Sequence, residues 1–221
     1  MALPKPEIRT RWWEAFLLRL YETLTLNDPV QAADLVFVAA GRMERKQYGL
    51  ELYREGVAPR LIISVGSTEV HRMWRLNLDG LDGLVAARDN TRPEERHFFV
   101  GVDCWGTRVE KVRLPRLNTY GEAVGLRRFL EGEVVRSVIV VSTDVHLRRI
   151  RVSFRRVFRG TALKVLYCHV PSGLAPFTKD RWWMRSDVRR LVLKEGVKLA
   201  GYRLILSLPD WLIRTVMRLR C

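Results

Sequence analysis

Short runs of apolar residues alternate along the chain with longer segments in which apolar residues recur every three or four positions. The first run, 35–40, reads Leu-Val-Phe-Val-Ala-Ala, as expected of a strand buried on both faces. A helical pattern at 43–55 and a second apolar run at 60–66 follow it. This strand–helix–strand order predicts a βαβ unit with parallel strands and a right-handed crossover.

The same alternation continues towards the C-terminus. Further strands are predicted at 97–102, 109–114, 136–143 and 162–170, and helices at 118–132, from His146 onwards and over 181–208. The segment 67–96 contains glycines, a proline and mixed charge, which predict a helix fragment and a loop. The pattern as a whole predicts an α/β fold, a three-layer α/β sandwich with a mainly parallel, Rossmann-like sheet.

Amphipathic segments lie at both ends of this pattern. Trp12, Trp13 and Phe16 belong to a helical segment at 8–26, which charged residues interrupt, so it fits neither a signal peptide nor a spanning helix. Its Trp-rich face either packs on the domain, which we favour, or lies on a membrane surface. We therefore predict an N-terminal amphipathic helix (1–28), one α/β domain that ends in a long C-terminal helix (29–208), and a basic amphipathic tail (209–221).

The charge balance directs attention to anionic partners. The 221 residues include 39 Lys and Arg against 24 Asp and Glu, which gives a formal net charge of +15. Nucleic acid, acidic lipid and small phosphorylated ligands remain open as partners. Nucleic acid is the least favoured, because the basic helix at 145–159 accompanies no known nucleic-acid motif. Three cysteines without CxxC spacing argue against disulfides and zinc and favour a reducing cytosol.

The ligand site of an open parallel sheet lies beyond the carboxyl ends of its strands. Residues that follow the predicted strands, or open the next helix, are therefore the candidates: Gly41, Arg45, Ser64, Gly66, Asn118, Thr119, Glu122, Thr143, Asp144, His146, Arg148 and Arg149. Several of these are also ordinary helix caps. Thr119 and Glu122 have the spacing of a capping box, and Thr143 or Asp144 could cap the following helix.

Glu195 interrupts the apolar stripe of the last long helix and must therefore face inward. A buried carboxylate has to be paired or protonated, so we predict an Arg or His partner. Whether this is a structural ion pair or an acid/base group stays open.

Motifs that would identify a reaction do not occur in the sequence. It contains no GxGxxG after a strand, no Walker loop and no GxSxG elbow. The four histidines are scattered without metal-ligand spacing, so we predict no metal site. The cofactor is unknown, and S-adenosylmethionine or another nucleotide-like ligand remains open.

Four blocks in order resemble the SanA/ElyC/YdcF family, a bacterial domain of unknown function. They are 34–59 with Arg45, 62–66, Asn118-Thr119 with Glu122, and 140–149. The resemblance implies a Rossmann-like domain, a ligand pocket around these residues and, for some relatives, a link to the cell envelope. Two departures are Arg113 and Arg116, which stand where relatives tend to have an acidic residue and a serine.

Our first hypothesis is that the chain binds a phosphorylated or nucleotide-like anion at the C-terminal edge of the sheet, with hydrolase or transferase chemistry linked to cell-envelope metabolism. His146, with Asp144 or Glu122, would move a proton, and the remaining candidates would bind the ligand. The alternatives are a non-enzymatic protein on an acidic membrane surface and, less favoured, a nucleic-acid-binding protein. The expected location is the cytoplasm, with peripheral contact at the inner membrane left open.

Overall fold

A six-stranded sheet forms the centre of the protein. The computed structural model describes residues 12–114, 117–175, 177 and 179–218. The strand order is β4-β3-β2-β1-β5-β6. Strands β1, β2, β5 and β6 are parallel, whereas β3 pairs antiparallel with both β2 and β4. The strands are β1 (Leu35–Val38), β2 (Leu61–Gly66), β3 (His97–Asp103), β4 (Gly106–Lys111), β5 (Ser137–Ser142) and β6 (Lys164–His169).

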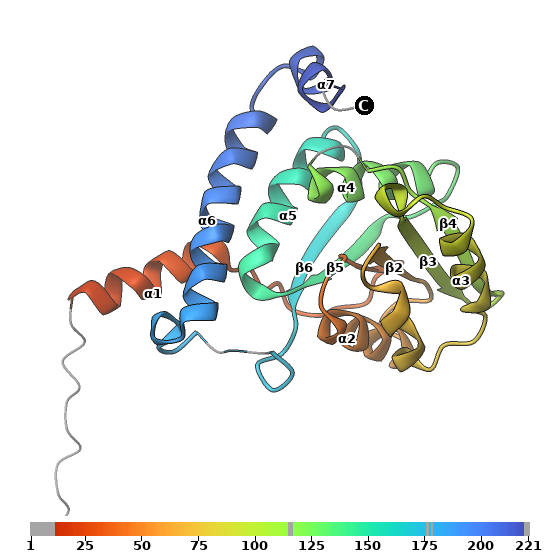
Figure 1. The fold of residues 1–221 in the computed structure, drawn as a ribbon, viewed down its shortest axis with the longest axis horizontal. Coiled ribbons are helices and arrows are strands. Elements are labelled where there is room, and N and C mark those ends of the chain that lie inside the picture. The colour runs from red at the N-terminus through yellow and green to blue at the C-terminus, as the bar shows by residue number, and fades with distance from the viewer. Residues whose placement is uncertain (1–11, 115–116, 176, 178, 219–221) are drawn as a thin grey trace, which may run out of the picture.

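Helices cover both faces of this sheet, which gives the predicted α/β sandwich (Figure 1). The α-helices are α1 (Trp12–Leu24), α2 (Met43–Arg54), α3 (Asp82–Asp89), α4 (Asn118–Phe129), α5 (Asp144–Val157), α6 (Ser186–Leu206) and α7 (Asp210–Arg218). Short 3-10 helices lie at η1 (Val70–Leu76), η2 (Pro93–Glu95) and η3 (Trp182–Met184).

Alternate residues of each central strand enter opposite halves of the core. Val36 and Val38 of β1 pack with side chains of α2, η1 and α3, whereas Leu35 and Phe37 pack with those of α4 and α5. All four side chains are removed from water. The continuous apolar run in the sequence therefore reflects a strand covered on both faces, as predicted.

Beyond the sandwich, α1 and α6 pack on the outer side of α5. Tyr21 and Leu24 of α1 join Val145, Val188 and Val192 in a separate apolar cluster. Near the end of α6, Tyr202 and Leu206 pack with Ile213 of α7. The segments assigned to the N-terminal helix and the tail thus both contribute buried side chains to the domain. Residues 1–11 of the predicted N-terminal helix lie outside the described residues.

The region after β2 is more ordered than its composition indicated. The segment 67–96 contains η1, α3 and η2, and the two strands that follow form a hairpin with Cys104 and Trp105 at its turn. Gly106, with a φ of 119°, occupies a conformation that side chains rarely adopt. The hairpin places β4 three residues earlier than the predicted 109–114.

The capping-box prediction is wrong. The α4 N-cap is Leu117, which makes no side-chain capping hydrogen bond. The Thr119 hydroxyl accepts from Arg149, and Glu122 accepts from other elements, so both face the protein interior. Thr143 is the N-cap of α5 but its side chain does not cap it, because the hydroxyl accepts from Arg45 instead.

Candidate functional site

The sheet changes winding direction between β1 and β5. The chain leaves β1 through α2 towards β2 on one side, while β5 lies on the other side of β1. At this switch point, beyond the carboxyl ends of the strands, lies a cavity of about 460 Å³. Its lining includes most of the predicted site residues together with others: Ala40, Gly41, Gly66, Ser67, Thr68, Glu69, Glu94, Glu95, Arg96, His97, Val112, Leu114, Asn118, Thr119, Glu122, His146, Arg149 and Lys198.

Glu122 joins three elements at the floor of the cavity. Its Oε1 accepts from the Ala40 amide at 2.8 Å and from the Ser64 hydroxyl at 2.6 Å. The Ser64 Oγ also lies 2.7 Å from Nε2 of His97. Ser64 itself is fully buried. It therefore connects His97 with Glu122 rather than meeting a ligand, whereas His97 and Glu122 both line the cavity.

The predicted partner of Glu195 is Arg149, with His146 beside it. Arg149 Nε donates to Glu195 Oε2 at 3.0 Å, and Lys198 donates to Oε1 at 3.1 Å. Arg149 also donates to the Thr119 hydroxyl, and its guanidinium stacks over the Tyr202 ring at 5.1 Å. Burial alone would raise the pKa of Glu195, but its polar neighbours outweigh burial and lower it, and the charges among them are those of Arg149 and Lys198. Glu195 is therefore ionised.

His146 is a neutral hydrogen-bond donor in this arrangement. Arg149 Nη2 lies 2.7 Å from its Nδ1, and a guanidinium can only donate, so Nδ1 accepts and Nε2 carries the proton. Glu195 Oε2 is farther from Nδ1, at 3.4 Å. Burial, helped by the charge of Arg149, lowers the pKa of His146 to about 3 even though Glu195 opposes the shift. His146 can thus polarise a ligand oxygen but is a weak base.

Arg45 fixes the backbone between β1 and β5. It donates to the Ala40 carbonyl and, at 2.8 Å, to the Thr143 hydroxyl. Burial lowers its pKa to about 10, against the opposing charge of Glu122. A Cβ on Gly41 would lie 2.8 Å from Arg45 Nη1, and Gly41 has a φ of 130°. Gly41 is therefore required both by its conformation and by the close approach of this side chain.

Lys46 and Glu69 form a buried pair that the sequence analysis did not identify. Lys46 is fully buried and donates to Glu69 and, at 3.0 Å, to the Gly41 carbonyl. A Cβ on Gly66 would lie 2.8 Å from Glu69 Oε1, so Gly66 makes room for this carboxylate. The sequence does contain a sign of this burial. Lys46 lies four residues before the buried Leu50 and so on the same face of its helix, in the way that Glu195 lies within the apolar stripe of α6.

His97 was missed for a different reason. It begins β3, and the start of an antiparallel strand lies at the same edge as the ends of its parallel neighbours. His97 accordingly pairs with Gly66, the last residue of β2. Only the antiparallel direction of β3, which the pattern does not disclose, brings it to the cavity.

Three helices begin at this edge without side-chain caps. The N-caps of α2, α4 and α5 are Arg42, Leu117 and Thr143, and none makes a side-chain capping hydrogen bond. Helix N-termini carry partial positive charge and unpaired N–H groups. Of the amides in these first turns, that of Thr119 donates to the Tyr202 hydroxyl at 3.3 Å and that of Val145 to Asp144. The donors that line the cavity are therefore the side chains of Asn118, His146 and Lys198, within the positive field of the helix ends.

The predicted site residues that do not line the cavity are Arg45, Ser64, Thr143, Asp144 and Arg148. Asp144 accepts a hydrogen bond from the Tyr21 hydroxyl of α1 and from the amide of Val145. Arg148 donates to the carbonyls of Thr23 and Thr25, at the end of α1. Both therefore hold α1 against α5 and do not line the cavity. Arg113 is exposed, and Arg116 lies outside the described residues.

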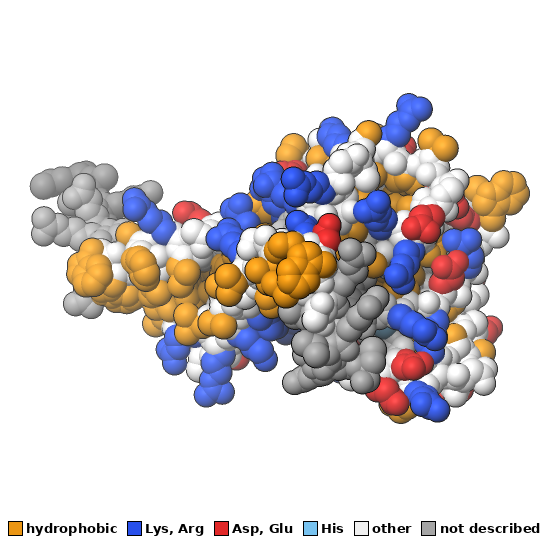
Figure 2. Space-filling view, turned by 90° about the horizontal axis from the view of Figure 1, so that it is seen from above, with side chains coloured by type: hydrophobic (Ala, Val, Ile, Leu, Met, Phe, Trp, Pro, Cys, Tyr) orange, Lys and Arg blue, Asp and Glu red, His pale blue; other side chains and the backbone are white. Residues whose placement is uncertain are grey.

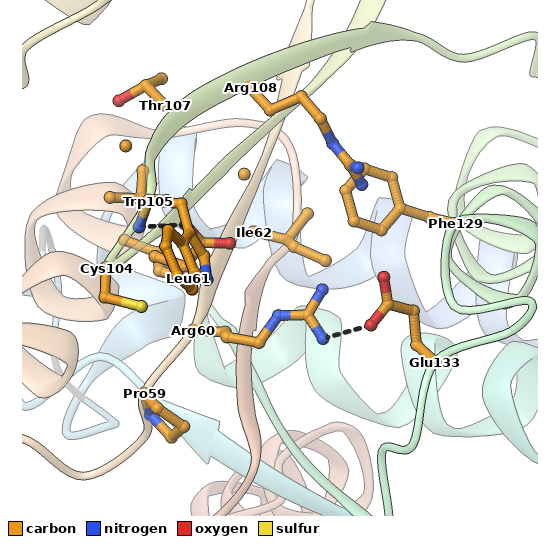
Figure 3. Close-up of a pocket in the computed structure, with 14 residues that line it drawn as sticks. Pro59, Arg60, Leu61, Ile62, Cys104, Trp105, Thr107, Arg108, Phe129 and Glu133 are labelled. Carbon is orange, nitrogen blue, oxygen red and sulfur yellow. Dashed lines mark hydrogen bonds and ion pairs between the residues drawn. The ribbon is translucent and has the colours of Figure 1, made fainter.

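A larger hollow of about 650 Å³ lies around the β3–β4 hairpin, away from this edge (Figure 3). Its charged groups are already engaged, since Arg60 pairs with Glu133 at 3.1 Å and the Arg108 guanidinium lies over the Phe129 ring. Trp105, at its rim, is 93% exposed. No cluster of buried polar groups comparable with that at the carboxyl edge lines this hollow in the described chain.

Among the described residues, no group of His, Cys, Asp and Glu side chains is arranged to hold a metal ion, and no helix is long and apolar enough to cross a membrane. Comparison of the chain with protein-family models, curated proteins and solved structures gave no match.

Proposed function

We propose that this protein binds a phosphorylated or nucleotide-like anion in the cavity at the carboxyl edge of the sheet. The observation that carries the proposal is the convergence on one cavity of the first turns of α4 and α5, through Asn118, Thr119 and His146, with the cations Arg149 and Lys198. Such N-termini favour anions because their N–H groups and partial charges point outward. S-adenosylmethionine is the nucleotide-like alternative, but its sulfonium and ammonium groups outweigh its carboxylate, so it would bind as a cation and not as the proposed anion.

Side-chain charge along the α5–α6 wall supports the same assignment. Arg149 and Lys198 carry two positive charges, Glu195 carries one negative charge, and His146 is neutral, so this wall has a net charge of +1. Nε2 of His146 and the amide of Asn118 add hydrogen-bond donors at the same place. The cavity is also lined by Glu69, Glu94 and Glu95, of which Glu69 pairs with Lys46 and Glu95 with Lys111.

For chemistry on the ligand we propose Glu122 as proton acceptor and His146 as the donor that polarises an oxygen. Glu122 Oε1 is fixed by the Ala40 amide and Ser64. Asp144 is no longer proposed as a proton-transfer group, because its carboxylate accepts a hydrogen bond from the Tyr21 hydroxyl and does not line the cavity. Hydrolase or transferase chemistry in cell-envelope metabolism is suggested by the resemblance to the SanA/ElyC/YdcF family. A cytoplasmic location is suggested by the cysteine pattern. Both stay part of this proposal.

Isothermal titration calorimetry with inorganic phosphate, AMP and S-adenosylmethionine tests the binding proposal. Asn118→Asp adds a carboxylate to the cavity without breaking a described pair, and it should weaken binding of phosphate and AMP by about tenfold or more but not that of the cationic S-adenosylmethionine. Asn90→Asp makes the same change at the exposed end of α3 and should leave binding unchanged. Equal affinity of the Asn118→Asp variant and the parent for phosphate and AMP, or binding of neither of them, would overturn the proposal.

A further inference from the structure

Helix α6 is apolar on two opposite faces. One face, which includes Val188, Val192 and Leu199, packs on α5 and α1. With 3.6 residues per turn, Leu193, Val197 and Leu204 fall on the opposite side, and they are 50%, 75% and 70% exposed. A surface helix normally places charged or polar residues there. This second stripe therefore needs an explanation other than packing within the domain.

Large apolar side chains are exposed on the neighbouring helices as well. Trp12 and Phe16, one turn apart on α1, are 83% and 62% exposed, and Trp211 of α7 is 65% exposed. Figure 2 shows orange side chains along the part of the molecule formed by α1 and α6 and again at α7, with blue side chains on both sides. We call this set the outer apolar face: Trp12, Phe16, Leu193, Val197, Leu204 and Trp211. A concentration of exposed apolar side chains on three adjoining helices is typical of a contact site.

Basic residues border the outer apolar face. Arg189, Arg190, Lys194 and Arg203 are all exposed on α6. The two acidic residues of this helix are already engaged, since Asp187 pairs with Arg185 and Glu195 lies buried beside Arg149. Tryptophans at the ends, aliphatic residues between them and cations alongside are the composition of helices that lie in the interface of a bilayer.

Charge decides between the occupants that such a face could accept. A second copy of the chain packed through α6 would bring the same basic residues of two subunits together, and like charges at close range repel. An anionic bilayer attracts them instead, and the amphipathic rings of Trp are favoured at the headgroup level. We propose that the outer apolar face docks this protein on the surface of a membrane that contains anionic lipid. The proposal does not depend on what the cavity binds.

Vesicle flotation with the full chain tests this docking. We expect binding to vesicles of phosphatidylcholine with about one third phosphatidylglycerol, and at least tenfold weaker binding to phosphatidylcholine alone. Val197→Glu places a negative charge in the middle of the face and should weaken binding to the mixed vesicles by roughly tenfold. Val134→Glu makes the same change at an 83% exposed position outside this face, in the segment before β5, and should have no effect.

The outcomes separate the docking from its alternative and from the ligand proposal. If the parent does not float with the mixed vesicles, or if Val134→Glu weakens binding as much as Val197→Glu, the docking is wrong. Sedimentation of the parent as a dimer that Val197→Glu dissociates would assign the face to a second copy. Calorimetry on Val197→Glu with the ligands of the cavity reports on the other proposal alone, because Val197 does not line the cavity.

Discussion

Glu195 and Arg149 are two charged side chains that depend on each other in a place with little water. Each is less than a tenth exposed, and they meet through two N–H groups of the guanidinium. Their mutual attraction offsets the cost of removing both charges from water. Removal of the Glu195 carboxylate would therefore leave the buried Arg149 charge without its anion. The pair also fixes His146 and Thr119, which line the cavity.

Glu195→Gln should therefore destabilise the protein strongly. Removal of the carboxylate leaves the Arg149 charge uncompensated, and the expected loss in free energy of unfolding is about 3 kcal/mol. Urea denaturation followed by circular dichroism measures it. Glu133→Gln removes one partner of the more exposed pair with Arg60 and should cost less than about 1 kcal/mol. Similar losses for the two variants would show that Glu195 is not the anchor of this cluster.

The lowered pKa of His146 predicts how stability depends on pH. The ordinary pKa is 6.5 and burial lowers it to about 3 in the folded protein, so between these values the unfolded chain binds a proton that the folded protein does not. Stability is then fully present above pH 6.5 and falls as the pH decreases towards 3. His146→Asn should reduce this slope between pH 6.5 and 4.5, above the ordinary pKa of Glu195.

Urea midpoints across this pH range measure the effect. Burial also lowers the pKa of His97, so part of the slope should remain in His146→Asn and disappear in the double variant with His97→Asn. His71→Asn is the matched control at an exposed position. A slope that is identical in the parent and in His146→Asn would contradict a buried neutral imidazole at this site.

At the scale of elements, the apolar periods predicted the parallel core well because strands covered on both faces leave continuous runs. The direction of β3 was not predictable in this way, since the hydrophobic pattern of a strand is the same whether the strand runs parallel or antiparallel to its neighbours. This is why His97 escaped notice while Glu122 and Arg149 did not. The caps were misjudged for a related reason: Thr and Glu at a helix start have the same pattern whether they bond their own backbone or a neighbouring helix.

A small number of polar contacts add to the apolar packing of α1 on α5, and their contribution can be tested. Tyr21 donates from α1 to Asp144, and Arg148 of α5 donates back to the α1 carbonyls. Tyr21→Phe keeps the ring but removes the hydroxyl, and it should cost about 1 kcal/mol. We expect faster hydrogen exchange of the α1 amides by mass spectrometry. Tyr53→Phe, on the far side of the sheet, is the control, and equal protection of α1 in all three proteins would argue against this role.

At the scale of the whole molecule, the net charge of +15 acts on stability as well as on partners. Much of this charge lies on exposed arginines of the helices, above all α5 and α6, where basic residues outnumber acidic ones. Mutual repulsion of such charges destabilises a compact state, and salt screens it, because the Debye length falls from about 30 Å at 0.01 M to about 8 Å at 0.15 M. The buried pairs at the cavity are screened much less.

Sodium chloride should therefore raise the thermal unfolding midpoint over this range at neutral pH, whereas the same salt should weaken the predicted vesicle binding. Differential scanning calorimetry measures the first effect and flotation the second.

Phosphate at matched ionic strength separates general screening from occupation of the cavity, because a ligand that binds only the folded protein adds stability by mass action. The extra stabilisation by phosphate over chloride should disappear in Asn118→Asp and persist in Asn90→Asp. A midpoint that falls with chloride would mean that surface ion pairs outweigh the repulsion of the excess positive charge.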